Sequence, residues 1–303
     1  MIFDFENSIN EPVQLPDKWG VELFIKREDN IHAFVSGNKY RKLKYNLLEA
    51  DKAGFKTLLT FGGAYSNHIA AVASAGNILG FKTIGVIRGD ELRNSINTNP
   101  TLRFAQDNGM QFKFIPRDLY RDKTNNSFIE SLKTEFGAFY LIPEGGTNTL
   151  AIQGCEEILK ESDKEFDYIC CAVGTGGTIS GLINCSKPGQ QVLGFPALKG
   201  EFLQQVISKF ASEDHWKLIH DYHFGGYAKI NTELISFINE FKKKNNIPLD
   251  PVYTGKMMFG IFNLIEKNYF PKGSKILAIH TGGLQGISGM NAILKKKNLP
   301  III

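Results

Sequence analysis

Short apolar runs rich in β-branched residues alternate with helix-like patterns along most of this 303-residue chain. The apolar runs have the length of buried strands, and the stretches between them carry apolar residues at the spacing of one helix face. Alternation of this kind is typical of mostly parallel sheets with helices packed on both faces. We therefore expect an α/β fold built from doubly wound, three-layer domains.

The same pattern assigns elements to numbered segments. The expected strands cover residues 56–61, 83–87, 111–115, 138–142, 168–173 and 276–279. The expected helices cover residues 67–79, 102–106, 128–136 and 156–160. Neither an internal repeat nor a low-complexity linker divides the chain. We predict a small mobile α/β domain at residues 46–146 and a large domain formed by residues 1–45 and 147–303.

The charge balance argues against a nucleic-acid partner. Lys and Arg total 35 and Asp and Glu total 31, which leaves a formal net charge of only +4. Two lysine runs, at residues 242–244 and 295–297, each follow an apolar-periodic stretch. Cations suit the last turn of a helix because they oppose the negative end of its dipole. We therefore interpret both runs as helix ends and expect no nucleic-acid binding.

The cysteines indicate a reducing compartment. Cys155, Cys170, Cys171 and Cys185 form no CxxC pattern and have no zinc-ligand spacing, so we expect no metal site. Adjacent Cys170 and Cys171 would point to opposite faces of one strand as structural thiols. We find neither a secretory leader nor an apolar run long enough to cross a bilayer. We therefore expect a cytoplasmic protein that does not bind membranes.

Four glycine-rich loops lie at residues 62–67, 145–148, 174–178 and 281–283, each after an expected strand. Ligands of parallel α/β sheets bind at the carboxyl ends of the strands, where such loops sit. The third loop reads Gly174, Thr175, Gly176, Gly177 and Thr178. Its glycines allow close backbone approach, its threonines supply hydroxyls, and a helix expected directly after it would aim N–H groups at an anion. The loop therefore predicts a phosphate cradle.

A lysine supplies the second half of a cofactor site. Nucleotide motifs do not fit the phosphate loop, because Ile179 stands where G-x-G-x-x-G needs glycine and no Gly-Lys-Ser/Thr ending is present. Lys39 follows Ser-Gly-Asn at the start of an apolar-periodic helix, where the helix dipole lowers the pKa of an amine. A neutral amine forms Schiff bases with aldehydes. Lysine and cradle together indicate pyridoxal 5′-phosphate more than a nucleotide.

Several segments resemble those of a known family. They read IKRED at residues 25–29, SGNKYRKL at 36–43, SNH at 66–68 and DPVYTGK at 250–256. They are similar to segments of the D-cysteine desulfhydrase and 1-aminocyclopropane-1-carboxylate (ACC) deaminase family, which are pyridoxal-phosphate enzymes of fold type II related to the tryptophan synthase β-subunit. The resemblance covers about residues 12–289 and implies two domains with the cofactor in the cleft between them.

The resemblance also implies roles for individual residues. Lys39 would form the Schiff base with the cofactor, Asn67 would bond its ring oxygen, and Ser66 would lie beside the substrate. The implied catalytic residues are Lys39, Ser66, Tyr227 and Tyr253. The implied cofactor ligands are Lys39, Asn38, Asn67, Gly174, Thr175, Gly176, Gly177, Thr178, Thr254 and Thr281. The implied substrate contacts are Ser66, Asn67, His68, Tyr227 and Tyr253, although a purely local hydrogen bond is an equal alternative for His68.

Two positions bear on the reaction. The ACC deaminases of the family carry Glu and Leu where this chain has Thr254 and Thr281, and the D-cysteine desulfhydrases carry threonines. A carboxylate near the pyridine nitrogen favours protonation of that nitrogen and a stronger electron sink. Elimination of hydrosulfide needs less carbanion stabilisation than opening a cyclopropane ring. We therefore favour conversion of D-cysteine to pyruvate, hydrogen sulfide and ammonia.

Other interpretations stay open. Within the same class, the alternative is deamination of ACC to 2-oxobutanoate and ammonia. From other classes, the rivals are a noncatalytic binder of a phosphorylated metabolite and a nicotinamide dehydrogenase, which the glycine spacing disfavours. The resemblance further implies a small amino-acid substrate, closure of the small domain over it, and a homodimer.

Overall fold

The computed structural model describes residues 5–303. Its α-helices are α1 (Asn38–Lys52), α2 (Asn67–Leu79), α3 (Pro100–Asp107), α4 (Arg117–Arg121), α5 (Asn126–Phe136), α6 (Thr149–Cys155), α7 (Gly177–Cys185), α8 (Phe202–Ser208), α9 (Thr232–Asn245), α10 (Thr254–Glu266) and α11 (Gly286–Lys296). Its strands are β1 (Asn10–Pro12), β2 (Glu22–Lys26), β3 (Thr57–Gly62), β4 (Lys82–Arg88), β5 (Met110–Ile115), β6 (Tyr140–Ile142), β7 (Tyr168–Val173), β8 (Gln191–Pro196), β9 (Trp216–Leu218) and β10 (Lys275–Ile279).

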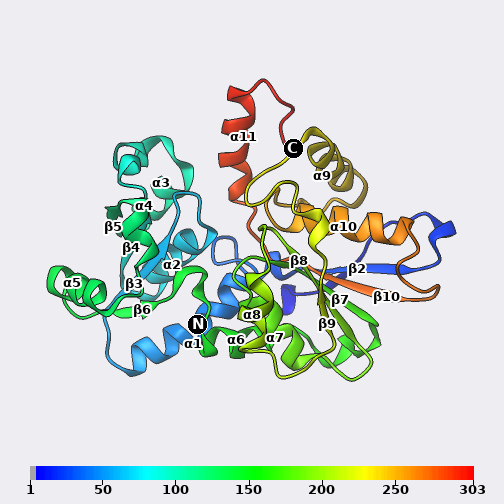
Figure 1. Ribbon diagram of the computed structural model, residues 1–303, viewed down its shortest axis with the longest axis horizontal. Helices are drawn as coiled ribbons and strands as arrows, with labels where there is room; N and C mark the ends of the chain where they lie inside the picture. Colours follow the sequence, from blue (N-terminus) through cyan, green and yellow to red (C-terminus); the bar gives the residue numbers. More distant parts are fainter. Residues whose placement is uncertain (1–4) are drawn as a thin grey trace.

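The strands form two sheets that lie on opposite sides of the molecule in Figure 1. A six-stranded sheet has the order β1-β2-β10-β7-β8-β9, and a four-stranded sheet has the order β5-β4-β3-β6. All pairs are parallel except β1 with β2. The predicted α/β fold with mostly parallel sheets is therefore confirmed.

The six-stranded sheet is covered on both faces. Cys170 packs into a core with residues of α9 and α10, and its neighbour Cys171 packs into a second core with residues of α7 and α8. Successive side chains of a strand point to opposite faces, so the two thiols mark the two sides of β7. Both cysteines are buried and free, as the sequence predicts.

The four-stranded sheet has the same three-layer construction. Leu58 packs into a core with residues of α1, α2 and α3, whereas Leu59 packs against α4 and α5. Helix α2 starts at a Ser66 cap and ends at Gly80, whose φ of 76° is the left-handed conformation that glycine adopts without strain. These local signals explain why the predicted bounds of α2 are confirmed.

All strands of the smaller sheet lie within residues 57–142, inside the segment we expect to form the small domain. The boundaries at residues 46 and 146 themselves stay a prediction.

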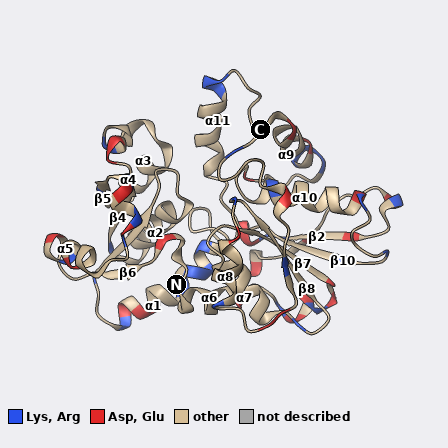
Figure 2. Ribbon diagram, in the orientation of Figure 1, with Lys and Arg blue, Asp and Glu red and all other residues tan. Residues whose placement is uncertain are grey.

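The lysine run 242–244 occupies the last turn of α9, and Lys295 and Lys296 occupy the last turn of α11. Charged residues of both signs are interspersed over the elements (Figure 2). Across residues 5–303, none of the helices has the length and apolarity required to span a membrane.

One expected helix is wrong. Residues 156–160, predicted as helical, follow the end of α6 and form turns. The helix starts earlier because the Asn148 side chain accepts a hydrogen bond from the Ala151 N–H at 2.9 Å and caps it. Ile158 lies in this turn and is fully buried in the core. An apolar residue at this position therefore does not indicate a helix. Strands β1, β2, β8 and β9 were not predicted.

Candidate active site

The glycine loops meet in space although they are far apart in sequence. A methyl group at Gly37 would lie 2.2 Å from the Thr281 carbonyl oxygen, and one at Gly283 would lie 2.8 Å from the Asn67 Nδ2. These contacts bring the start of α1, the start of α2 and the loop after β10 together. Gly37 also has a φ of 59°, so any side chain there would be strained as well as obstructed.

The remaining two loops face each other across the same region. A methyl group at Gly177 would lie 2.9 Å from the Thr147 side chain, and one at Gly174 would lie 3.1 Å from the Tyr253 ring. The four glycine-rich segments therefore converge at the carboxyl ends of the strands, where parallel sheets bind ligands.

Lys42 lies at the meeting point of two loops. Its Nζ donates to the Gly145 carbonyl at 3.2 Å, to Thr147 Oγ1 at 3.1 Å and to Thr175 Oγ1 at 3.3 Å. The residue is 2% exposed, and burial lowers the pKa of its amine. The three acceptors are neutral oxygens, so a bound anion would be the natural counter-charge for this ammonium.

The residues around Lys42 fit a phosphate group. Gly176 and Gly177 are buried at the start of the nine-residue helix α7, whose first N–H groups and dipole favour an anion. The contacts of Gly145 and Gly177 leave no room for side chains at either position, so the backbone itself forms the wall of this cradle. Sequence reasoning missed Lys42, although its position three residues after Lys39 on one helix face was a usable signal.

Lys39 stands beside the cradle. Its Nζ donates to Asn38 Oδ1 at 3.0 Å, and Asn38 Nδ2 donates to Thr178 Oγ1 at 2.8 Å. Burial, assisted by the positive charge of Lys42, lowers the pKa of Lys39 from 10.5 to about 7. The predicted direction is correct, but burial is the largest cause. An amine with this pKa is about half neutral at neutral pH and reacts readily with an aldehyde.

The pKa of Lys39 should be visible as the pH dependence of its chemical reactivity. Only the neutral amine is nucleophilic, so trace acetylation of Lys39 should rise with pH through a midpoint near 7 and then level off. Lys42→Met removes a charge that lowers this pKa, so the midpoint should move upward. Mass spectrometry of the Lys39 peptide measures both midpoints, with Lys44, which is paired with Glu157, as the internal reference. A Lys39 midpoint near 10 would contradict the assignment.

Ser66 and Asn67 stand at the start of α2. Ser66 Oγ accepts hydrogen bonds from the N–H groups of His68 and Ile69 at 3.2 and 3.3 Å. As an acceptor in both bonds, Ser66 keeps its hydroxyl hydrogen for a ligand. Asn67, half-buried, reaches the Gly283 backbone, so the structure brings this pair to the converging loops.

The ring of His68 lies beneath the loops. Thr60 Oγ1 donates to the Ile142 carbonyl at 2.8 Å, so it must accept from His68 Nε2, also at 2.8 Å. This fixes the tautomer with hydrogen on Nε2 and leaves buried Nδ1 without a hydrogen-bond partner among the described residues. Burial and the charges of Lys39 and Lys42 hold the His68 pKa well below 6.5, so the ring is neutral. Its role in substrate binding stays a prediction.

The two predicted tyrosines form a pair. The rings of Tyr227 and Tyr253 lie 6.2 Å apart at an interplanar angle of 65°. Tyr227 is 44% exposed, whereas Tyr253 is partly buried beside Gly174. Burial raises the pKa of both phenols, so both hydroxyls keep their hydrogens at neutral pH.

Thr254 is bound to a carboxylate that sequence reasoning missed. Its hydroxyl donates to Asp250 Oδ1 at 2.8 Å, and the same Asp250 accepts the N–H groups of Val252, Tyr253 and Thr254. Burial raises the pKa of Asp250, and these hydrogen bonds oppose the rise. Thr254 Oγ1 also accepts the Asp250 N–H at 2.9 Å and the residue is fully buried, so its hydroxyl is bonded to Asp250 both as donor and as acceptor.

The residue before Thr281, His280, is buried and bonded to the backbone on both ring nitrogens. His280 Nε2 donates to the Pro248 carbonyl at 2.7 Å, and its Nδ1 accepts the Gly282 N–H at 3.2 Å. The Thr281 carbonyl accepts the Asn38 N–H at 3.4 Å, next to Lys39. The predicted residues 38, 39, 66–67, 174–178, 227, 253–254 and 281 therefore surround one region.

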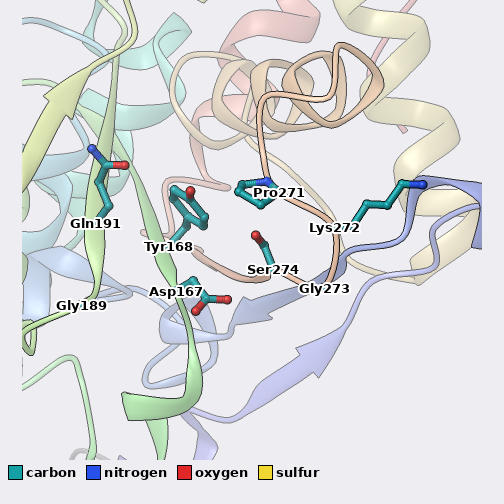
Figure 3. Close-up of a pocket in the computed structure, with 8 residues that line it drawn as sticks. All are labelled: Asp167, Tyr168, Gly189, Gln191, Pro271, Lys272, Gly273 and Ser274. Carbon is teal, nitrogen blue, oxygen red and sulfur yellow. The ribbon is translucent and has the colours of Figure 1, made fainter.

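A separate pocket of about 470 Å³ lies at the opposite end of the large sheet. Figure 3 shows its polar lining, which includes Tyr168 and Gln191 at the first residues of β7 and β8, and Asp167 directly before β7. These are the amino ends of parallel strands, away from the converging loops, and none of the predicted site residues lines the pocket. We do not assign the predicted chemistry to it.

Known proteins resemble the chain over nearly its full length. Residues 9–282 match the family described as "Pyridoxal-phosphate dependent enzyme". A mitochondrial bifunctional D-cysteine desulfhydrase/1-aminocyclopropane-1-carboxylate deaminase from Arabidopsis thaliana is 32% identical, covering 88% of this chain and 74% of the plant protein. A 1-aminocyclopropane-1-carboxylate deaminase from Rhizobium rhizogenes is 30% identical and covers 89% of each chain.

Solved structures show the same relationship. The crystal structure of an ACC deaminase homologue superposes with a TM-score of 0.81 at 29% identity, covering 95% of this chain and 93% of the other. A hydrogen sulfide-producing enzyme from Fusobacterium nucleatum superposes with a TM-score of 0.67 at 18% identity, covering 92% and 96%. At that identity the second likeness concerns the fold alone.

Proposed function

This chain belongs to the pyridoxal-phosphate dependent enzymes, in the group that contains ACC deaminases and D-cysteine desulfhydrases, and we propose that it is a lyase acting on D-cysteine. The products would be pyruvate, hydrogen sulfide and ammonia. The observation that carries this choice is the pair Thr254 and Thr281. The family resemblance implies Glu and Leu at these two positions in the ACC deaminases.

The converging loops would hold the cofactor by three groups of residues. Residues 174–178 and Lys42 would bind its phosphate, Lys39 would hold its aldehyde carbon, and Asn67 would bond its ring oxygen. When bound, pyridoxal phosphate supplies an electron-withdrawing ring that stabilises negative charge on the substrate Cα. This assignment is supported by the buried cation, the backbone-walled cradle and the amine of lowered pKa.

The protein residues would then bind the substrate and move its proton. Lys39 Nζ would take the hydrogen from the substrate Cα, because an amine whose pKa is about 7 can accept and return a proton at neutral pH. The Ser66 hydroxyl would donate a hydrogen bond to the substrate. Tyr227 and Tyr253, which stay protonated, would orient the substrate by donating hydrogen bonds.

Keto-acid release tests the substrate. The purified, cofactor-loaded protein would be incubated with D-cysteine, L-cysteine and ACC in parallel. We expect pyruvate from D-cysteine and no 2-oxobutanoate from ACC. Turnover of ACC alone would replace the proposal with ACC deamination, which is the name carried by the Rhizobium relative. Release of no keto acid from any amino acid, with phosphate-ester binding retained, would favour a noncatalytic binder.

A pair of substitutions tests the reason for the choice. Thr254→Glu combined with Thr281→Leu should move the ratio of the two kcat/KM values toward ACC, because both residues would then be those that the resemblance implies for the ACC deaminases. The matched control is Thr232→Glu at the exposed first residue of α9, which should leave the ratio unchanged. An unchanged ratio in the double variant would remove the threonine argument.

We also propose that two copies of the chain associate and that residues 46–146 close over the substrate. Closure would exclude water around the carbanion. Sedimentation of the cofactor-loaded protein tests the association, and we expect the mass of two chains. Small-angle scattering on addition of a substrate analogue tests the closure, and we expect a smaller radius of gyration.

A further inference from the structure

The loop that carries Tyr227 has an unusual backbone. Phe224 and Ala228 have φ values of 54°, and between them Gly225 and Gly226 have φ values of 92° and 119°. Non-glycine residues rarely adopt positive φ because the Cβ crowds the backbone carbonyl. Such strain persists only where surrounding contacts hold it, and it often marks a functional site.

Helix α10 provides those contacts from one face. The Lys256 Nζ donates to the His223 carbonyl at 2.9 Å and to the Gly226 carbonyl at 2.8 Å. Phe259 packs edge-on against the Phe224 ring, with centroids 5.0 Å apart. Residues three apart in a helix share a face, so the lysine and the phenylalanine hold the same loop.

The burial of Lys256 is explained by its bonds to this loop. The residue is 2% exposed, and both of its hydrogen-bond acceptors are neutral carbonyls. Burial lowers its pKa to about 8, and the negative charge of Asp250 opposes this fall. A buried lysine charge normally has a partner, and here the two backbone bonds and the negative charge of Asp250 offset its desolvation.

We propose that Lys256 is a positioning residue that fixes the Tyr227 ring against Tyr253. Tyr253 immediately precedes α10, so the helix sets its place through the chain itself. Tyr227 belongs to a different segment, and Lys256 ties the carbonyl of the preceding residue to the same helix. The inference rests on the proposed function, because it assumes that the tyrosine pair contacts the substrate.

The test compares Lys256→Met with Tyr227→Phe and with the double variant in the cofactor-loaded protein. We expect Lys256→Met to lower kcat/KM by about 10 to 100-fold, since small misplacements of substrate-contacting groups have effects of this size. Because Lys256 acts through Tyr227, the double variant should lose little more than the worse single variant. Multiplied losses would overturn the proposal.

Hydrogen exchange gives a readout that does not depend on turnover. Lys256→Met should increase amide exchange in residues 223–229 and leave β7 and α9 unchanged, whereas an unchanged loop would overturn the proposal even if activity fell. Lys275→Met, the same change at a partly exposed lysine paired with Glu165, is the matched control. If Lys256→Met does not fold, Lys256→Gln keeps amide donors and serves in the same two measurements.

The two proposals fail differently. If no amino acid is turned over, the proposed function fails, and loop exchange still reports on Lys256. If turnover and loop protection both survive Lys256→Met, the function stands and the positioning role is wrong.

Discussion

Replacing Lys39 with alanine is expected to lower kcat/KM for keto-acid release by at least about 10³-fold. The variant removes an amine whose pKa is lowered to about 7. This amine is also linked to the phosphate loop, because Asn38 accepts a hydrogen bond from Lys39 and donates one to Thr178. The same amine is proposed both to hold the cofactor and to move the Cα proton. Loss of two roles in one residue explains why this effect should exceed that of any other substitution in the site.

Reductive trapping tests the first of these roles, which is holding the cofactor. Borohydride treatment of the loaded wild-type protein should add the mass of the reduced cofactor to the Lys39 peptide, and the variant should show no such peptide. Lys44→Ala, on the same helix but paired with Glu157, should behave as wild type. Trapping on Lys42 in place of Lys39 would contradict the assignment, since Lys42 is the nearest rival amine on α1.

The largest expected effect on stability is that of Arg41→Ala. The Arg41 guanidinium binds Glu28 through Nε to Oε2 at 2.8 Å and Nη2 to Oε1 at 2.9 Å, and Glu28 is fully buried. Removing the arginine would leave a buried carboxylate without its counter-charge, which typically lowers the free energy of unfolding by about 3–5 kcal/mol. The Glu28 carbonyl also accepts the Gly37 N–H at 2.9 Å, so the start of α1 should loosen with it.

Urea unfolding of three variants tests this account. Arg117→Ala removes a guanidinium from an exposed pair with Glu91, so the free energy of unfolding should change little. Arg41→Met combined with Glu28→Gln removes both charges and should be less destabilised than Arg41→Ala alone. Equal losses for Arg41→Ala and Arg117→Ala would show that burial does not strengthen the pair.

Local sequence signals predicted the parts of the fold that depend on neighbouring residues. Helix α2 begins after the Ser66 cap and ends before Gly80, and its bounds match the prediction. The bounds of β7 also match, because the strand coincides with one apolar run. The glycine-rich loops and Lys39 could be predicted because each belongs to a short local motif. The family resemblance then assigned roles that spacing alone could not.

The missed features depend on contacts between distant segments. Strand β2 spans only five residues, and its parallel partner β10 begins about 250 residues later, which no local pattern reports. Lys42 gains its place in the cradle from Gly145 and Thr175, and Lys256 from a loop more than 25 residues earlier. A lysine on an amphipathic helix is ordinarily exposed, so only the folded chain reveals these two as buried.

The strand order of the large sheet also bears on how the protein is made. Strand β2 lies between β1 and β10, so that sheet stays incomplete until the segment after residue 275 has left the ribosome. The small sheet needs only residues 57–142 and can assemble much earlier. Lys39 is therefore synthesised long before the Thr281–Gly283 segment that completes its site. We expect nascent chains to carry an unpaired β2 edge until β10 has been synthesised, and such an edge can pair with another chain.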